Sequence, residues 1–188
     1  MRGPPQSQTG AKLTQFSRDR TGTATKTDTP LLDTPQSITV VSRQQIRDQN
    51  VQNLTEQLRY VPGVIPAQGE NNRDEVVIRG QKTNADFFVN GVRDDVQYFR
   101  DLYNIERIEV LKGPASVLYG YAATGGVVNV TRRVPTEKFI LGAHVRGGSL
   151  GYFDLGANVG GEITDGLHFY AGGFLSGGKQ WRSTNDKN

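Results

Sequence analysis

The segment from residue 137 to residue 188 alternates hydrophobic residues with small or polar ones. Apolar or small side chains occupy every second position in three runs, Phe139–Val145, Phe153–Val159 and Leu167–Gly173. This period of two predicts antiparallel β-strands, each with one apolar face. Ile163–Gly166 is short enough to form a tight turn between the last two runs. Alternating runs of about ten residues are typical of outer-membrane β-barrel strands, and a soluble antiparallel meander has the same pattern.

A pattern of short β-branched segments and short helical segments runs from Leu31 to about Pro135 and predicts a folded α+β unit. Asn90-Gly91 is its strongest signal for a tight hairpin turn. β-Branched and aromatic residues predict strands at Ser37–Val41, Val76–Ile78, Phe87–Val89 and Ile105–Lys112, and a further strand from Val127.

Capping patterns in the same region predict short helices. Ser42 and Asn53 each lie three residues before a Gln or Glu, which is the spacing of an N-terminal capping box. The second helix is expected to end at Pro62-Gly63. We also expect a short apolar helix after Gly113-Pro114 and a helical turn over Tyr98–Tyr103.

Residues 1–30 have a third pattern, rich in Thr, Ser, Gln, Gly and Lys with few large apolar side chains. Such a segment cannot bury enough apolar surface to offset the entropy lost on ordering. We therefore expect residues 1–30 to be disordered.

Composition and charge argue against several classes of function. The chain of 188 residues carries a net charge of +3, which gives no support to nucleic-acid binding. It contains no cysteine, which excludes disulfides and thiolate metal sites. His144 and His168 stand alone on predicted strands, without metal-ligand spacing. Gly120 and Gly125 have the spacing of a phosphate loop, but Gly126-Val127 replaces the required Lys-Ser/Thr. We expect neither an enzyme nor a bound cofactor or metal.

Six segments, in one order, carry a resemblance to a known family. At this spacing they resemble the plug domain of TonB-dependent outer-membrane receptors, in the siderophore-receptor branch. Thr131–Pro135 and Tyr121–Thr124 depart from the family pattern near the end of the plug. The segments are DTPQSITVVS (Asp33–Ser42), LTEQLRYVPGV (Leu54–Val64), VVIRG (Val76–Gly80), FFVNGVRDD (Phe87–Asp95), YFRDLYNIERIEVLKGPASVLYG (Tyr98–Gly120) and GGVVN (Gly125–Asn129).

The resemblance implies a fold, a location and partners. The fold is an α+β plug domain over residues 31–135, with a small mixed sheet and short helices. Residues 136–188 then form the first antiparallel strands of a transmembrane β-barrel. The expected protein lies in the cell outer membrane, imports ferric siderophores and is energised by the TonB complex. The stretch Phe87–Tyr103 resembles receptors for catecholate-type siderophores. Its plug gates the barrel and contributes to ligand binding. A TonB box is expected near the N-terminus, where Thr21–Thr27 is a weak candidate.

The resemblance also implies that the chain is a fragment. A plugged transporter of this family needs about 22 strands, and only three are expected here. No apolar run reaches the roughly 18 residues of a transmembrane helix, no secretory apolar region follows Met1, and the polar stretch Trp181–Asn188 resembles a cut loop. The alternatives are a non-transporting solitary plug, the remnant of a truncated gene, or a receptor for another cargo such as cobalamin or haem.

Candidate ligand-binding residues lie in three expected apical loops, Glu70–Asp74, Gln81–Ala85 and Arg93–Arg100. A pocket for an anionic ferric siderophore requires cations, hydrogen-bond donors and aromatic walls. Each candidate could instead be a solvated loop residue, and neighbouring aspartates would partly cancel the positive field. The candidates are Arg73, Lys82, Arg93, Gln97, Tyr98 and Arg100.

Two further basic residues match family positions that hold the plug against the barrel. They are Arg79 of the IRG motif and Lys112 of the LKGP motif, and their partners would be carboxylates on the inner barrel wall. The alternative is a local ion pair within the plug, for example between Arg107 and Glu106 or Glu109.

Overall fold

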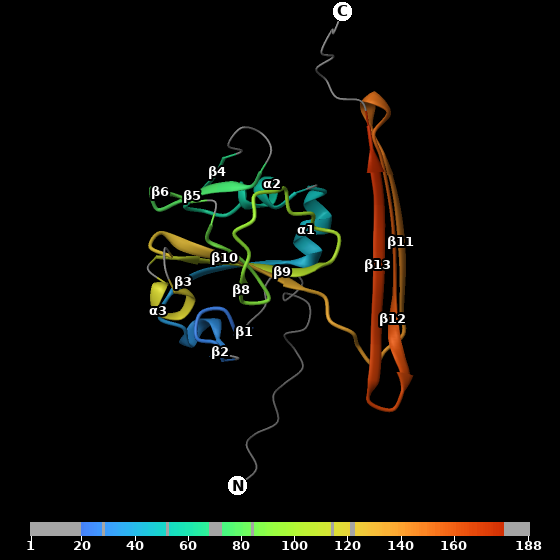
Figure 1. Cartoon of the computed structure of the whole chain (residues 1–188), viewed down its shortest axis with the longest axis horizontal. Coiled ribbons are helices and arrows are strands. Elements are labelled where there is room, and N and C mark those ends of the chain that lie inside the picture. The colour runs from blue at the N-terminus through green and yellow to red at the C-terminus, as the bar shows by residue number, and fades with distance from the viewer. Residues whose placement is uncertain are drawn as a thin grey trace, which may run out of the picture. The chain divides into compact units, whose positions relative to one another are not determined.

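The computed structural model describes residues 20–27, 29–51, 53–67, 73–83, 85–113, 115–120 and 123–178. The chain divides into two compact units, Met1–Arg132 and Arg133–Asn188 (Figure 1). The division falls three residues before Pro135, where the sequence analysis placed the end of the plug.

A five-stranded mixed sheet forms the centre of the first unit. The strand order is β3-β9-β10-β7-β8, and every neighbouring pair is antiparallel except β10 and β7, which are parallel. Asn90 (φ 52°) and Gly91 (φ 80°) make the two-residue turn between β7 and β8, as the Asn-Gly signal predicts. The strands span Ser37–Ser42 (β3), Phe87–Val89 (β7), Val92–Arg93 (β8), Ile105–Lys112 (β9) and Gly126–Arg132 (β10).

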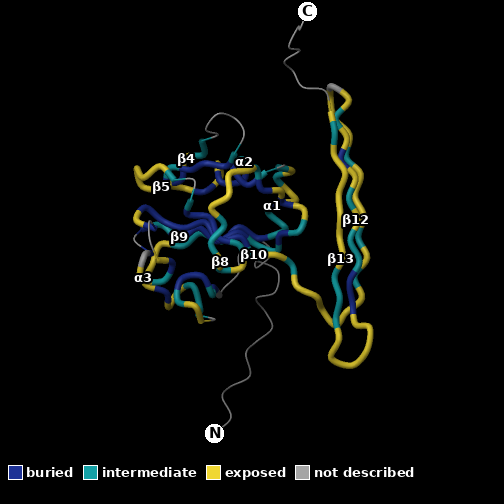
Figure 2. The backbone as a smooth tube through the Cα atoms, in the orientation of Figure 1, coloured by how far each residue is buried: buried dark blue, intermediate teal, exposed yellow. Residues whose placement is uncertain are grey.

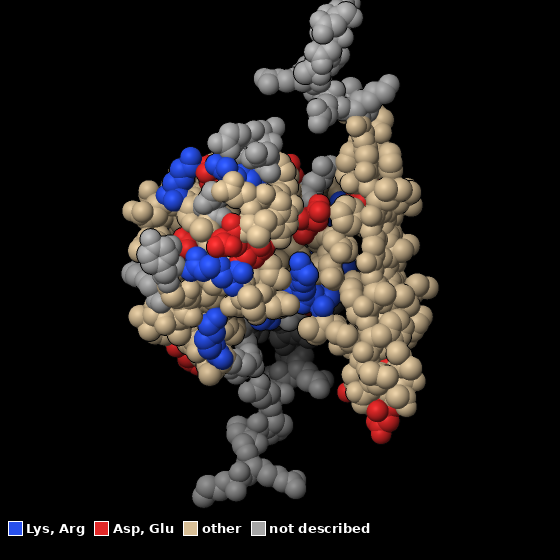
Figure 3. All heavy atoms as spheres, viewed as in Figure 1, with Lys and Arg blue, Asp and Glu red and all other residues tan. Residues whose placement is uncertain are grey.

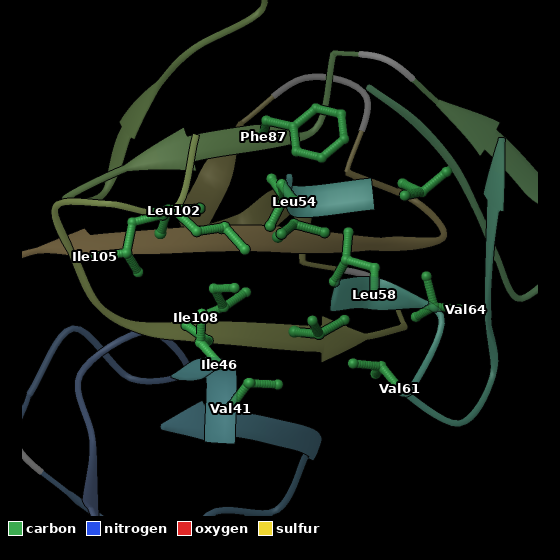
Figure 4. Packing of buried hydrophobic residues seen from close by; sticks show 14 of the residues in the cluster. Val41, Ile46, Leu54, Leu58, Val61, Val64, Phe87, Leu102, Ile105 and Ile108 are labelled. Atoms are coloured by element: carbon green, nitrogen blue, oxygen red, sulfur yellow. The ribbon is translucent and has the colours of Figure 1, made fainter. Parts of the chain in front are cut away.

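One face of this sheet is covered by helices α1 (Arg43–Gln49) and α2 (Leu54–Leu58) and by a small antiparallel sheet (Figure 1). The side chain of Ser42 accepts a hydrogen bond from the N–H of Gln45, and that of Asn53 accepts one from the N–H of Glu56. Both predicted helix starts are therefore confirmed. The small sheet contains β4 (Val64–Ala67), β5 (Glu75–Ile78) and β6 (Gln81–Thr83). Side chains from these elements meet those of β7 and β9 in the main core, labelled in Figure 4: Val41, Ile46, Leu54, Leu58, Val61, Val64, Phe87, Leu102, Ile105 and Ile108.

The opposite face of the sheet is covered by α3 (Ser116–Tyr119) and by residues that the sequence analysis expected to be disordered. β1 (Arg20–Thr21) pairs with β2 (Thr29–Pro30), and a 3-10 turn follows at Leu31–Asp33. Ala24 joins a second buried cluster with Phe88, Leu111, Ala115, Tyr119, Ala123 and Val127. Disorder therefore does not hold for residues 20–27, 29 and 30, and residues 1–19 lie outside the described part of the chain.

The predicted helical turn over Tyr98–Tyr103 is wrong. Its backbone groups bond to distant elements instead of to the next turn of a helix: the N–H of Leu54 donates to the carbonyl of Arg100 at 3.1 Å, and the N–H of Asp74 donates to the carbonyl of Tyr98 at 3.1 Å. Asp101 also forms an isolated antiparallel bridge with Asn53. Long-range pairing therefore overrides the local propensity.

The second unit is an antiparallel meander of β11 (Ile140–Gly147), β12 (Phe153–Thr164) and β13 (Leu167–Gly177), with a 3-10 turn at Ser149–Gly151. All three predicted strands are confirmed. In Figure 2 most positions along them are exposed or partly buried. One face gathers apolar side chains that remain exposed, among them Leu141, Val145, Leu155 and Leu175. The other face carries Asp154, which lies 3.4 Å from His144 and 3.5 Å from Arg146.

Candidate functional site

A charged cluster joins the start of β5 to the loop after β8. The guanidinium of Arg73 donates to Oε1 of Gln97 at 2.7 Å, which fixes two of the predicted ligand residues side by side. Glu75, whose side chain is nearly buried, lies 3.8 Å from Arg73 and 3.0 Å from Nζ of Lys82. Two cations therefore share one carboxylate. Glu75 could not be predicted from the sequence, because nothing in its local pattern distinguishes it from the other loop acids.

Tyr98 and Arg100 form a second, stacked group. The Arg100 guanidinium lies 4.3 Å from the ring centre of Phe87 and 4.5 Å from that of Tyr98. It pairs with Asp94 at 3.0 Å and donates to the carbonyls of Asp94 and Val96. Its side chain is only 5% exposed. Arg100 thus holds the loop in shape, and its donors are directed to the protein itself.

Tyr98 is the exposed part of this group. Its hydroxyl donates to Oδ2 of Asp94 at 2.7 Å. Burial of the ring edge, and then this hydrogen bond, raise the pKa of Tyr98 above its ordinary value, so the hydroxyl stays a neutral donor at physiological pH. The arrangement offers a ligand an aromatic ring backed by a guanidinium.

Asp74 holds the loop after β8 in place from the interior of the plug. Its carboxylate, fully buried, accepts from the hydroxyl and N–H of Thr55 and from the N–H of Arg100, and it lies 3.6 Å from the Arg100 guanidinium. These contacts connect the first turn of α2 to the loop that carries Gln97 and Tyr98. The sequence predicts Asp74 only as a member of an apical loop.

Arg93 is directed inward. It lies 3.7 Å from Asp86, donates to the carbonyls of Ala85 and Tyr119, and stacks over Phe88. It therefore ties β8 to α3. Of the six predicted ligand residues, Lys82, Gln97 and Tyr98 are exposed and Arg73 is partly exposed, while Arg93 and Arg100 mainly make internal contacts. Figure 3 shows basic and acidic atoms side by side on one face of this unit.

The two predicted coupling residues lie around one corner of the sheets. Arg79 is exposed in the β5–β6 turn and has a left-handed backbone conformation (φ 51°). Its guanidinium lies beside Gly113, 3.0 Å from the position that a Cβ atom would occupy there. Lys112, at the end of β9, donates to Oγ1 of Thr39 at 3.0 Å and to the carbonyl of Pro62 at 3.1 Å. Neither makes an ion pair with a carboxylate of the residues that the structure describes. The local pair named as the alternative does form elsewhere, between Arg107 and Glu109 at 3.4 Å.

Glycine is required at this corner. A Cβ at Gly125 would lie 2.6 Å from the carbonyl oxygen of Ile78, and one at Gly126 would collide with the carbonyl oxygen of Leu111. Because Gly126 also has a φ of 153°, a side chain there is excluded both by space and by the backbone. The two glycines therefore allow the β5–β6 turn to pack against the start of β10.

The structure shows no helix, among the residues it describes, that is long and apolar enough to cross a membrane. The same residues contain no group of three or more His, Asp or Glu side chains that could hold a metal ion.

Comparison with known proteins decides the family. The profile of the TonB-dependent receptor plug domain matches residues 30–127. The chain belongs to this family. The matched residues contain β3, β7, β8, β9 and the start of β10 in the central sheet, both helices that cover the sheet, and all of the candidate residues discussed above.

Relatives of known name agree with this assignment. The chain is 36% identical over 126 residues to the probable TonB-dependent siderophore receptor PiuA of Acinetobacter baumannii, covering 65% of this chain and 17% of that protein. It is 31% identical over 177 residues to the ferrichrome outer membrane transporter/phage receptor of Escherichia coli K12, covering 89% of this chain and 24% of that protein. The chain therefore spans less than a quarter of the length of these relatives.

Solved structures show the same fold. The structure of FpvA of P. aeruginosa, bound to a heterologous ferric pyoverdine, superposes with a TM-score of 0.80 at 26% identity. The superposition covers 88% of this chain and 23% of FpvA. It includes both the plug domain and strands that follow it, which agrees with the predicted fold class of a plug domain followed by antiparallel strands.

Proposed function

We propose that this chain forms the plug and first strands of an energy-coupled importer of ferric siderophores in the outer membrane. The observation that carries the proposal is the order of the two units: a plug domain is followed, in the same chain, by antiparallel strands with one exposed apolar face. β12 and β13, with 12 and 11 residues, are long enough to cross a bilayer at a tilt, since about 9–11 residues suffice, and β11 pairs with β12 along all 8 of its residues. Their apolar face would contact lipid.

The ligand surface of this importer consists of Arg73, Lys82, Gln97 and Tyr98. Two cations that share a single carboxylate leave a positive surface, and Tyr98, whose hydroxyl is held by Asp94, adds an aromatic wall. This chemistry suits an anionic ferric complex, such as that of a catecholate siderophore. Arg93 and Arg100 act on the ligand indirectly, by holding the loops that present the other four.

The names of relatives support a siderophore cargo and span several chemical types. Besides the ferrichrome transporter, a catecholate siderophore receptor, Fiu of Escherichia coli K12, is 39% identical over 111 residues. Cobalamin and haem therefore become the less favoured cargoes for this chain.

The plug gates the barrel, and the TonB complex supplies the energy that moves it. Arg79 and Lys112 contribute to gating by contacting carboxylates on the barrel wall. Support comes from their position at one corner of the plug, with cationic ends that no described carboxylate neutralises. An importer needs such a polar interface because a gate held only by apolar packing would be costly to separate from its wall in water.

An equilibrium binding experiment on the complete receptor tests the cargo. The receptor that contains this chain is purified from outer membranes and titrated with ferric catecholate, hydroxamate and pyoverdine complexes, with cyanocobalamin and with haem. The proposal predicts tight binding of at least one ferric siderophore and no binding of cyanocobalamin or haem. Binding of cobalamin or haem alone would replace the siderophore assignment, and failure to bind any compound would reject an importer of these classes.

A further inference from the structure

Helix α2 is fastened at its first turn to the loop that carries Tyr98. The N–H of Leu54 donates to the carbonyl of Arg100 at 3.1 Å. Thr55 donates through its hydroxyl and its N–H to the buried carboxylate of Asp74, which also accepts from the N–H of Arg100 at 2.8 Å. The start of the helix and this part of the ligand surface therefore share one set of hydrogen bonds.

The other end of α2 leads directly to Lys112. After Leu58 the chain continues in turns, and the N–H of Val61 donates to the carbonyl of Leu58 at 3.0 Å. The ammonium of Lys112 donates to the carbonyl of the next residue, Pro62, at 3.1 Å. Its stem passes Gly63, where a Cβ atom would lie 3.6 Å from Cδ of Lys112. Lys112, at the end of β9, therefore holds the segment that ends the helix.

The body of the helix is buried between these two attachments. Leu54 and Leu58 are 0% exposed, and Val61 is 2% exposed. Apolar packing holds the helix against the central sheet, but this force is non-directional. Hydrogen bonds require defined distances and angles, so the contacts at the two ends fix where the helix lies along its own axis. Because α2 has only 5 residues, little more than one turn, a displacement of one end reaches the other.

Lysine suits this position because an ammonium has three donors. Lys112 directs one to the carbonyl of Pro62 at 3.1 Å and one to Oγ1 of Thr39 on β3 at 3.0 Å. Within the described part of the chain these are its two acceptors, which leaves the third donor for the barrel-wall carboxylate of the proposed function. The positive charge strengthens each bond relative to one between neutral groups. One side chain can therefore hold the helix and contact the wall at the same time.

We propose that Lys112 positions the ligand surface through α2. Its bond to the carbonyl of Pro62 holds the helix whose first turn holds the loop of Tyr98. Lys112 is thus a positioning residue, since it acts through the helix. The proposal rests on the proposed function, because it gives a second role to a residue of the coupling corner. The contacts that carry it lie entirely within the plug.

Titration of the complete receptor in detergent solution, with ferric tris-catecholate and ferric tris-hydroxamate complexes, measures the effect on the ligand surface. Lys112→Met keeps the apolar stem, removes the ammonium, and should weaken binding about fivefold. Lys112→Arg restores a cationic donor and should bind within about twofold of the unaltered receptor. Unchanged affinity in Lys112→Met would overturn the proposal.

Two matched variants separate the route through α2 from other routes. Thr39→Val removes the other hydrogen bond of Lys112 and keeps the bond to Pro62, so it should leave the affinity unchanged. Arg79→Gln removes a cation from the same corner, where its guanidinium lies beside Gly113, and should also leave the affinity unchanged. A loss of affinity in Arg79→Gln equal to that in Lys112→Met would place the effect in the contact with the barrel and overturn the proposal.

Amide hydrogen exchange of the same receptor without ligand tests the attachment of the helix directly. The N–H of Leu54 donates to the carbonyl of Arg100, so its exchange reports the contact between helix and loop. Lys112→Met should accelerate this exchange about fivefold, while the amide of Val128 on β10 should exchange as in the unaltered receptor.

This exchange experiment keeps the test separate from the cargo. Unchanged exchange at Leu54, or equal acceleration at Leu54 and Val128, would overturn the proposal, because the helix would then not depend on Lys112 or the whole plug would be loosened. A receptor that shows the expected exchange and binds neither ferric complex would support the positioning role of Lys112 and reject the proposed cargo.

Discussion

The carboxylate of Asp74 accepts a hydrogen bond from the main-chain N–H of Arg100 at 2.8 Å, across 26 residues of sequence. The same carboxylate caps Thr55 at the start of α2. One buried side chain therefore sets the position of the loop that presents Gln97 and Tyr98. The ligand surface of this plug rests on an internal polar network and not on the loop's own conformational preference.

Asp74→Asn should destabilise the plug by about 1–3 kcal/mol, because it weakens hydrogen bonds to a buried charge and removes the buried carboxylate that lies 3.6 Å from the Arg100 guanidinium. Urea unfolding followed by circular dichroism measures the change. Asp95→Asn serves as the control, since Asp95 is exposed in the same loop, and it should change stability by less than about 0.5 kcal/mol. Equal effects of the two substitutions would show that Asp74 does not anchor the loop.

Lys82→Gln and Arg73→Gln should each weaken the binding of an anionic ferric siderophore roughly tenfold, because each removes a cation from the ligand surface. Titration of the complete receptor measures the dissociation constant. Arg59→Gln removes an exposed cation from the end of α2, outside the ligand surface, and should leave the affinity unchanged. If all three variants bind as the unaltered receptor does, these loops do not contact the ligand.

Arg79→Gln should separate transport from binding. If Arg79 holds the plug against the barrel, removal of its charge alters the rate of uptake and leaves the equilibrium affinity for the siderophore unchanged. Arg79→Lys keeps the charge and should retain more of the native rate, although an ammonium lacks the two-pronged donor geometry of guanidinium. A parallel loss of affinity and uptake would place Arg79 in ligand binding instead.

High pH should destabilise the plug around Tyr119, whose hydroxyl donates to the carbonyl of Thr23 at 2.7 Å. Burial of the ring raises the pKa of Tyr119 to about 12 from an ordinary value of 10.0, so the folded plug favours the neutral hydroxyl. Its contribution to stability is complete below pH 10 and is lost as the pH rises toward about 12. The stability advantage of the unaltered chain over Tyr119→Phe, taken from urea midpoints, should therefore shrink across this window. A constant difference from pH 8 to pH 12 would contradict the assignment.

Local patterns in the sequence predict much of this fold. β9, the Asn90-Gly91 hairpin, both capped helices and the three strands of the second unit follow from alternation and turn chemistry, which act between near neighbours. Polar residues in the middle of buried strands were a further signal that sequence reasoning left unused. Asn129 within Val127–Val130, and Glu109 between apolar neighbours, indicate a partner that must cover them.

The rest depends on contacts between distant residues. Thr23 is held by hydrogen bonds to Glu109 on β9 and Asn129 on β10, which no count of apolar residues in residues 20–30 can reveal. Arg93 and Arg100 lie in loops and look like exposed cations, yet aromatic rings and carbonyls of other segments enclose them. A sequence pattern locates such side chains on a loop but does not show which of their donors the protein itself uses.

The most direct test of the account is uptake of iron by whole cells. A bacterium that lacks its own siderophore receptors is given the complete receptor, and entry of radioactive iron from the ferric siderophore that it binds is followed with TonB active and with TonB deleted. The account predicts uptake that requires both the receptor and TonB. Uptake that continues without TonB, or a receptor that binds the siderophore in the outer membrane and never imports it, would contradict the account.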